Sequence, residues 1–382
     1  MSLKWQDATA ITQPDIVVLI DDETTSDACH DLVFGSCGIW IDGRLHRLIV
    51  FHADSLRKRD LMLLRTQVKK LATENVKAEL ISLSRFVDDV LYPYVYDSRA
   101  LLVGFNLPFD LSRLACHWGL GRKKWRDGFA FTLSKKRFRP PIHIKSLDST
   151  KAFIEFASPP RRNQRHPRPH YRGRFLDLRT LCFALTDERM TLERACRLFQ
   201  TEDHKTEIEE YGKITAESIR YNINDTFATH DLYVKMIERY DSFHLTKPTE
   251  KIYSPASIGK QYLTQMGIKP FLEQNPDFPS EILGCVMPTF YGGRSEVRIR
   301  KKPLRVRYVD FSSMYPSLFS MMRLWPFLIA DRIECVDATK EIRRLVEKAD
   351  LQTLRNPDLW QQMVAIVRVQ PDEDALPARA HY

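Results

Sequence analysis

Three short, mostly apolar stretches lie near the start of the chain. Residues 16–21, 33–41 and 44–52 are mostly apolar and each has the length of a strand. Only Asp42-Gly43 separates the second stretch from the third, and this dipeptide suits a two-residue hairpin turn. The pattern therefore predicts a small sheet whose first strand ends at Asp21.

Helical periodicity follows these strands and then alternates with strand-like runs. Residues 83–91 predict a helix, and the apolar run 100–105 predicts a strand that delivers Asn106. Strands that feed helices indicate an α/β domain. Two further predicted helices have the apolar stripes Leu111, Leu114, Ala115 and Trp118, and Leu192, Ala195, Cys196 and Phe199.

The length and net charge of the chain limit the number of domains and the kind of partner that we expect. Its 382 residues, 43% hydrophobic, are enough for two globular domains, and a net charge of +9 favours an acidic polymer as partner. Charge alone does not separate nucleic acid from a membrane surface. No apolar run approaches membrane-spanning length and the N-terminus lacks a signal peptide, so we expect a cytoplasmic protein with no membrane partner.

The seven cysteines are scattered and show no close paired spacing. We therefore expect reduced thiols in the core, and the pattern implies neither a zinc site nor disulfides.

A basic, proline-rich stretch over residues 159–174 has too few apolar residues to form a core. It is either a contact for nucleic-acid phosphates or a solvated insertion, and charge runs are too common to decide between them. Farther on, Asp177 follows the apolar residues Phe175 and Leu176, which predict a strand. A change of composition near Lys247 suggests that the first domain ends at about residue 245.

Carboxylates recur at the ends of these predicted elements. Asp21 and Glu23 end a buried strand, where a pair of acids is costly unless a cation or a hydrogen-bond network balances it. Asp110 opens a predicted helix, and Tyr221 and Asp225 lie four residues apart on one helical face.

These acids suggest a two-metal site. Two ions about 4 Å apart, held by Asp21, Glu23, Asp110 and Asp225, would bind a scissile phosphate and activate a water. Tyr221 would orient that water, and hard oxygen ligands favour Mg²⁺ or Mn²⁺ over zinc.

Three motifs in this order resemble the tyrosine-bearing branch of the ribonuclease-H-like 3′-to-5′ proofreading exonucleases. They are Asp21-Asp22-Glu23-Thr24, Asn106-Leu107-Pro108-Phe109-Asp110, and Tyr221 through Asp225. Each motif alone is weak, and their ordered conjunction carries the resemblance. Asp22 departs from the family, which usually has an apolar or small residue there, and strand alternation would point it away from the metals.

The second motif also implies substrate contacts. Asn106 would contact the terminal nucleotide or steady the motif, and Phe109 would pack beneath it or serve as a core aromatic.

Residues 308–317, from Tyr308 to Ser317 and including Asp310 and Tyr315, resemble the first catalytic motif of family B DNA polymerases. The resemblance implies that Asp310 would hold the polymerase metals and that Tyr315 would exclude a ribose 2′-hydroxyl. The segment Phe290-Tyr291-Gly292-Gly293-Arg294 resembles the Tyr-x-Gly-Gly element of that family, which touches template DNA.

Other family B elements are absent from the sequence. We find no lysine motif of the finger helix and no Tyr-x-Asp-Thr-Asp motif, so two-metal nucleotidyl transfer should fail in this chain alone. An incomplete palm sheet would also leave an exposed edge.

The resemblance implies three regions. They are an α/β, ribonuclease-H-like exonuclease domain at residues 12–245, a linker and template-contacting region at 246–300, and an incomplete α+β polymerase palm at 301–382. The exonuclease motifs begin near the N-terminus, as in the compact polymerases of viruses, plasmids and mobile elements.

The expected activity is removal of 3′-terminal nucleotides from single-stranded DNA or a primer–template, with two Mg²⁺ or Mn²⁺ ions. Three alternatives remain open. A second polypeptide supplies the missing polymerase half, the protein is a non-catalytic DNA-binding remnant, or the sequence is a fragment.

Overall fold

The computed structural model describes residues 15–71, 77–158, 171–202, 213–289 and 299–370. The chain divides into two compact units, and the division falls between Gln265 and Met266. The first unit holds the three predicted exonuclease motifs, and the second holds the predicted polymerase motif.

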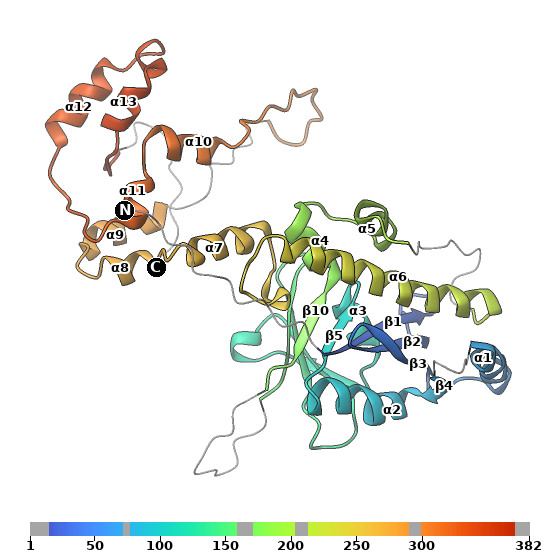
Figure 1. Ribbon diagram of the computed structural model, residues 1–382. Helices are drawn as coiled ribbons and strands as arrows, with labels where there is room; N and C mark the ends of the chain where they lie inside the picture. Colours follow the sequence, from blue (N-terminus) through green and yellow to red (C-terminus); the bar gives the residue numbers. More distant parts are fainter. Residues whose placement is uncertain (1–14, 72–76, 159–170, 203–212, 290–298, 371–382) are drawn as a thin grey trace, which may run out of the picture. The chain divides into compact units, whose positions relative to one another are not determined.

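A six-stranded sheet with the order β10-β5-β1-β2-β3-β4 forms the centre of the first unit (Figure 1). The pairs β1-β2 and β2-β3 are antiparallel, and the other neighbouring pairs are parallel. The strands are β1 (Ile16–Thr24), β2 (Leu32–Ile41), β3 (Arg44–His52), β4 (Lys77–Ser82), β5 (Leu101–Gly104) and β10 (Arg174–Asp177).

The predicted strands and their turn are confirmed. The predicted runs 16–21, 33–41, 44–52 and 100–105 coincide with β1, β2, β3 and β5, and Asp177 ends β10. Asp42 and Gly43 both have positive φ values, 48° and 73°, as a two-residue hairpin turn with matching twist requires.

A second, antiparallel sheet has the order β6-β7-β8-β9. Its strands are β6 (His117–Leu120), β7 (Phe129–Thr132), β8 (Ile142–Ser146) and β9 (Ala152–Phe156). The helix predicted to continue to Trp118 is wrong, because α3 (Leu107–Arg113) ends earlier and Trp118 lies on β6. Backbone pairing with β7, beginning with the Cys116 N–H on the Thr132 carbonyl, outweighs the local helical spacing.

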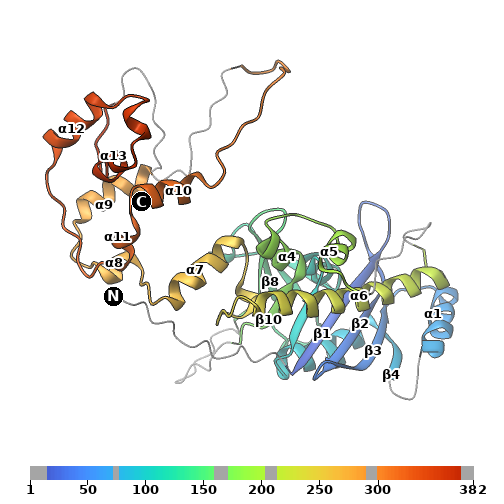
Figure 2. The same cartoon turned by 45° about the horizontal axis from the view of Figure 1, so that its top comes forward.

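Helices cover both faces of the six-stranded sheet, and α6 lies across β1 and β2 (Figure 2). Leu19 and Val103 point to the face covered by α4, α5 and α6, whereas Val18 and Ile20 point to α2, η1, α3 and the second sheet. The helices of this unit are α1 (Lys58–Leu71), α2 (Leu83–Phe86), the π-helix η1 (Val87–Asp97), α3, η2 (Lys123–Trp125), α4 (Leu178–Thr186), α5 (Leu192–Phe199), α6 (Ala216–Asp241), η3 (Thr249–Lys251) and α7 (Pro255–Gln265).

The segment after residue 245 packs on the same core. Ile252 is buried there, and Ile258 and Tyr262 of α7 lie against the cluster that α4 and α6 form. The first compact unit therefore extends to Gln265.

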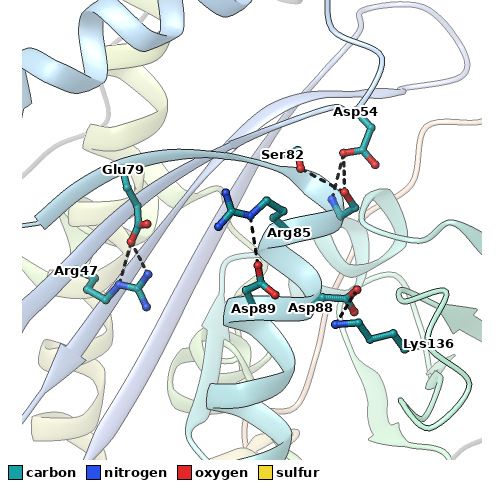
Figure 3. A network of polar contacts seen from close by, with 9 residues as sticks. Arg47, Asp54, Glu79, Ser82, Arg85, Asp88, Asp89 and Lys136 are labelled. Carbon is teal, nitrogen blue, oxygen red and sulfur yellow. Dashed lines mark hydrogen bonds and ion pairs between the residues drawn. The ribbon is translucent and has the colours of Figure 1, made fainter.

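Polar contacts stabilise the β4 edge of the six-stranded sheet (Figure 3). Arg47 on β3 pairs with Glu79 on β4, and Asp54 accepts hydrogen bonds from the Ser84 N–H (3.2 Å) and hydroxyl (3.1 Å) at the start of α2. These contacts fix the last strand and the helix that follows it.

The second unit contains helices and, in its described residues, no strand. The α+β character predicted for residues 301–382 is therefore not found in residues 301–370, because no neighbouring strand pairs with the extended segment before α10. The helices are α8 (Phe271–Gln274), α9 (Ser280–Val286), η4 (Met287–Thr289), α10 (Met314–Met321), α11 (Trp325–Ile329), α12 (Thr339–Lys348), η5 (Thr353–Arg355) and α13 (Pro357–Gln362).

The cysteines are free, and the prediction of core thiols holds for only three of them. Cys37, Cys182 and Cys196 are buried, whereas Cys29, Cys116, Cys285 and Cys335 are exposed.

Gly35 on β2 tests how tightly the central strands pack. A Cβ at this position would lie 2.5 Å from the Phe51 ring and 2.7 Å from the Asp21 carbonyl oxygen. We expect Gly35→Ala to lower the free energy of unfolding by about 1–3 kcal/mol, because the overpacked site must shift backbone or a buried ring. Urea denaturation followed by circular dichroism measures this.

Gly259→Ala is the matched control. Gly259 lies inside α7 with open space where a Cβ would be, so alanine should stabilise the protein by about 0.5–1 kcal/mol. Equal effects of the two substitutions would contradict the packing described for Gly35.

Candidate functional site

The carboxyl ends of β1, β5 and β10 lie at one edge of the main sheet. These three strands are parallel, and the strand order runs outward from β1 through β2, β3 and β4 on one side and through β5 and β10 on the other. In open α/β sheets, ligands bind at the carboxyl ends of the strands where the strand order reverses in this way. Asp21 and Glu23 end β1, Asn106 follows β5, and Asp177 ends β10, so the sequence delivers polar side chains to this edge.

Asp21 and Glu23 project from the same face of β1. Their partners in the neighbouring strand are Ser36 and Phe34, and the Ser36 hydroxyl donates to the Asn222 carbonyl on α6 at 3.2 Å. The two carboxylates therefore point to the face that α6 covers.

Asn222 links the first motif to the third. Its Nδ2 donates to the Asp21 carboxylate at 2.6 Å and to the Asp21 carbonyl at 3.2 Å, and the residue has no exposed surface. This residue was missed by the sequence analysis, although it directly follows Tyr221. The signal was a polar amide on the buried face of a helix.

Tyr221 and Asp225 lie on α6 as predicted, and both are buried, with 5% and 3% of their surfaces exposed. A capping box between Thr215 and Ser218 fixes the start of this helix. One turn therefore presents Tyr221, Asn222 and Asp225 from the helix that crosses β1 and β2.

Asp110 lies in the first turn of α3 and is almost fully buried. Its Oδ2 is buried and has no hydrogen-bond partner among the described residues. Burial raises the pKa of Asp110 well above its ordinary value, and the nearby charges of Asp22, Asp21 and Asp177 raise it further. The second motif is thus within electrostatic range of the first.

Asp177 anchors the two helices at this edge. Its carboxylate accepts hydrogen bonds from the N–H groups of Asn106 (2.8 Å), Leu107 (3.1 Å) and Thr180 (3.2 Å) and from the Thr180 hydroxyl (2.6 Å). Burial raises the pKa of Asp177, although these hydrogen bonds oppose the rise. One side chain therefore caps α3 and α4 together, a role that only the tertiary contact reveals.

Asn106 adopts a left-handed conformation, with φ 74° and ψ 40°, at the junction of β5 and α3. Asparagine tolerates this region better than most residues. Its backbone is held by Asp177, and its side-chain oxygen accepts a long hydrogen bond of 3.4 Å from Arg179. The structure thus shows Asn106 setting the turn of the second motif.

Asp22 lies on the opposite face of β1 from Asp21 and Glu23, as strand alternation predicts. It is not solvated, however, because both carboxylate oxygens are buried without a hydrogen-bond partner among the described residues. Burial, and then the charge of Glu23, raises the pKa of Asp22 well above its ordinary value, while Arg113 lowers it.

Phe109 is partly exposed and lies outside the three apolar clusters of the described residues. Its ring contacts His30 edge-on at 6.1 Å, and the Arg113 guanidinium lies 5.0 Å from its centre. Arg113 also donates to the carbonyls of Cys29 and His30, so it ties α3 to the loop after β1.

The predicted polymerase residues lie in the second unit. Asp310 and Tyr315 are exposed, and the Asp310 carboxylate accepts the Phe311 N–H at 2.9 Å. Pro316 lies in the first turn of α10. Tyr291, Gly292, Gly293 and Arg294 lie outside the described residues, as does most of the basic stretch 159–174.

Within the described ranges, no three histidine, cysteine, aspartate or glutamate side chains are arranged as a ready metal site. None of the described helices is long and apolar enough to cross a membrane. No protein-family model matches the sequence, and no curated protein matches it.

The Asp177 anchor can be tested by Asp177→Asn. Both carboxylate oxygens accept from N–H or O–H donors, so an amide NH₂ would face at least one donor. We expect a loss of about 2–4 kcal/mol in unfolding free energy, because hydrogen bonds to a charged acceptor contribute about 1.5–3 kcal/mol each. Thr191→Ala, which removes the single cap of α5, should cost about 1 kcal/mol. Similar losses in the two variants would argue against the double cap.

Asn222→Leu tests the link between α6 and Asp21. Loss of the amide removes two hydrogen bonds from Asp21, so we expect a cost of about 1–3 kcal/mol by thermal or urea denaturation. Thr229→Val is the control, because the Thr229 hydroxyl is buried without a partner among the described residues and its removal should be neutral or stabilising. An Asn222→Leu protein as stable as Thr229→Val would show that the link contributes nothing.

Proposed function

We propose that the first unit is a divalent-metal-dependent 3′-to-5′ exonuclease with a ribonuclease-H-like fold, which removes nucleotides from the 3′ ends of DNA. The observation that carries this proposal is the convergence of the three motifs. Asn222 of the third motif binds Asp21 of the first, and the charges of Asp22 and then Asp21 in the first motif both raise the pKa of Asp110 in the second.

The chemistry of these side chains fits a hard divalent cation. The acids present only oxygen donors, and the Asp110 Oδ2 is buried without a hydrogen-bond partner among the described residues. Neighbouring carboxylates repel one another, and a bound cation would offset this repulsion. Asp21, Glu23, Asp110 and Asp225 would hold Mg²⁺ or Mn²⁺, which when bound would activate water and stabilise the leaving oxygen.

The remaining roles fall to groups of this chain. Asn222 fixes the Asp21 carboxylate through two hydrogen bonds, and Asp177 fixes the turn that carries Asp110. Tyr221, on the same helical turn as Asn222, would accept or donate a hydrogen bond to orient the attacking water. Phe109 and Asn106, at the start of α3, would contact the terminal nucleotide.

Digestion of a 5′-labelled single-stranded DNA tests the activity. With Mg²⁺ or Mn²⁺ we expect stepwise shortening of a free 3′ end and none of a 3′-blocked end. Asp21→Ala and Asp225→Ala should each lower the rate by at least about 100-fold, because each removes a side chain on which metal binding depends. Denaturing gels resolve the products.

Thermal unfolding with and without Mn²⁺ supplies a readout apart from activity. Mn²⁺ should raise the melting temperature of the unsubstituted protein and leave both variants unchanged, since a ligand that binds only the folded state stabilises it. Folded protein that shows neither shortening nor a metal-dependent shift would refute the exonuclease and favour a DNA-binding role.

A further inference from the structure

On one face of the second sheet, the apolar side chains are buried at β8 and exposed at β6. The cross-strand pairs Phe131–Ile142 and Phe129–Ile144 join β7 to β8, and both isoleucines are buried. The pairs Trp118–Phe131 and Leu120–Phe129 continue the same face onto β6. There, Phe129, Trp118 and Leu120 expose 43%, 59% and 74% of their surfaces. We call these three residues the hairpin face.

The opposite face of the same hairpin is closed by its own loop. Trp125 in η2 is buried and packs on His143 of β8 at 5.1 Å, and Lys124 pairs with Glu155 of β9 at 2.5 Å. Gly128 has no room for a side chain, since a Cβ would lie 2.5 Å from the Ile144 carbonyl. The loop between β6 and β7 therefore packs against the opposite face of this sheet.

The aromatic rings of β6 and β7 on this face lie close to one another. The Trp118 and Phe129 ring centres lie 5.9 Å apart, and those of Phe129 and Phe131 lie 5.8 Å apart. A row of aromatic side chains can accept flat ligands at small cost in side-chain entropy.

The segment that contains the hairpin face is strongly basic. Residues 117–139 contain eight lysines and arginines and one aspartate, a net charge of +7 against +9 for the whole chain. Three of these cations are paired, because Lys124, Lys136 and Arg139 contact Glu155, Asp88 and Asp97, and Figure 3 shows the Lys136 pair. The other five are Arg122, Lys123, Arg126, Lys135 and Arg137, which are exposed and have no ion pair within the described chain.

We propose that the hairpin face is a stacking platform for single-stranded DNA. Every base offers a flat surface to an aromatic ring, and neighbouring cations neutralise the phosphates. Paired bases in a duplex are already stacked and would not reach the rings. A surface of only three apolar side chains on a sheet is also small for insertion into a membrane, which usually involves an amphipathic helix.

This proposal rests on the proposed exonuclease activity, because the platform would hold the DNA strand whose 3′ end the exonuclease shortens. Trp118 follows Asp110 by eight residues in the same unit, so their Cα atoms lie at most about 29 Å apart. A strand of a few nucleotides could occupy the platform while its 3′ end occupies the carboxylate site.

Fluorescence anisotropy with fluorescein-labelled dT20 in EDTA tests binding without cleavage. We expect salt-sensitive binding that is much weaker for a 20-base-pair duplex. Trp118→Ala should weaken binding by about 10-fold, the size of one lost base–aromatic stack, and Trp118→Phe should restore most of it. Phe153→Ala is the matched control, because Phe153 is an exposed aromatic on β9.

Charge reversal tests whether the basic side chains contribute to DNA binding. Lys123→Glu with Arg126→Glu should weaken binding and reduce its salt dependence. Arg59→Glu with Arg65→Glu, an equal change of charge at exposed positions of α1, should have a smaller effect.

Three results would overturn the platform. They are equal binding of duplex and single strand, equal effects of Trp118→Ala and Phe153→Ala, or capture by phosphatidylserine vesicles that dT20 does not displace. The two proposals fail separately: protein that binds dT20 in EDTA and loses that binding with Trp118→Ala, but shortens no DNA with Mg²⁺ or Mn²⁺, would refute the exonuclease and keep the platform.

Discussion

The burial of several carboxyl groups at the end of β1 is the constraint on which the first unit depends. Asp22 and Asp110 lie where desolvation and neighbouring negative charges raise their pKa values. The Asp21 carboxylate accepts a hydrogen bond from the Asn222 amide, and the Asp177 carboxylate accepts four hydrogen bonds from groups at the starts of α3 and α4. The starts of α3 and α4, and the position of α6 over β1, are therefore held by hydrogen bonds to buried acids.

The two units differ in how they bury apolar surface. In the first, residues from both sheets and from α1 to α7 form three apolar clusters. In the second, the described helices α8 to α13 contain no buried residue, and Val306 and Tyr308 expose 85% and 91% of their surfaces. Since apolar burial is the main favourable term in folding, the first unit has the means to be stable and the second has much less.

Local signals predicted much of the first unit. The Asp42-Gly43 turn fixed the β2–β3 hairpin, and strand alternation placed Asp21 and Asp22 on opposite faces. The spacing of Tyr221 and Asp225 correctly indicated one buried helical face. The helix predicted to reach Trp118 failed because strand pairing with a segment a dozen residues later decides the conformation of residues 117–120. The second sheet was missed for the same reason.

By itself, the sequence determined which chemical groups the protein has and where its strands and helices carry them, because turn chemistry and periodicity act over a few residues. Only the tertiary structure decided which groups meet. Asn222 reaches Asp21 across 201 positions of sequence, and Asp177 reaches Asn106 across 71. Such contacts depend on which strands are neighbours in the sheet, and that order follows from the burial of two apolar faces at once.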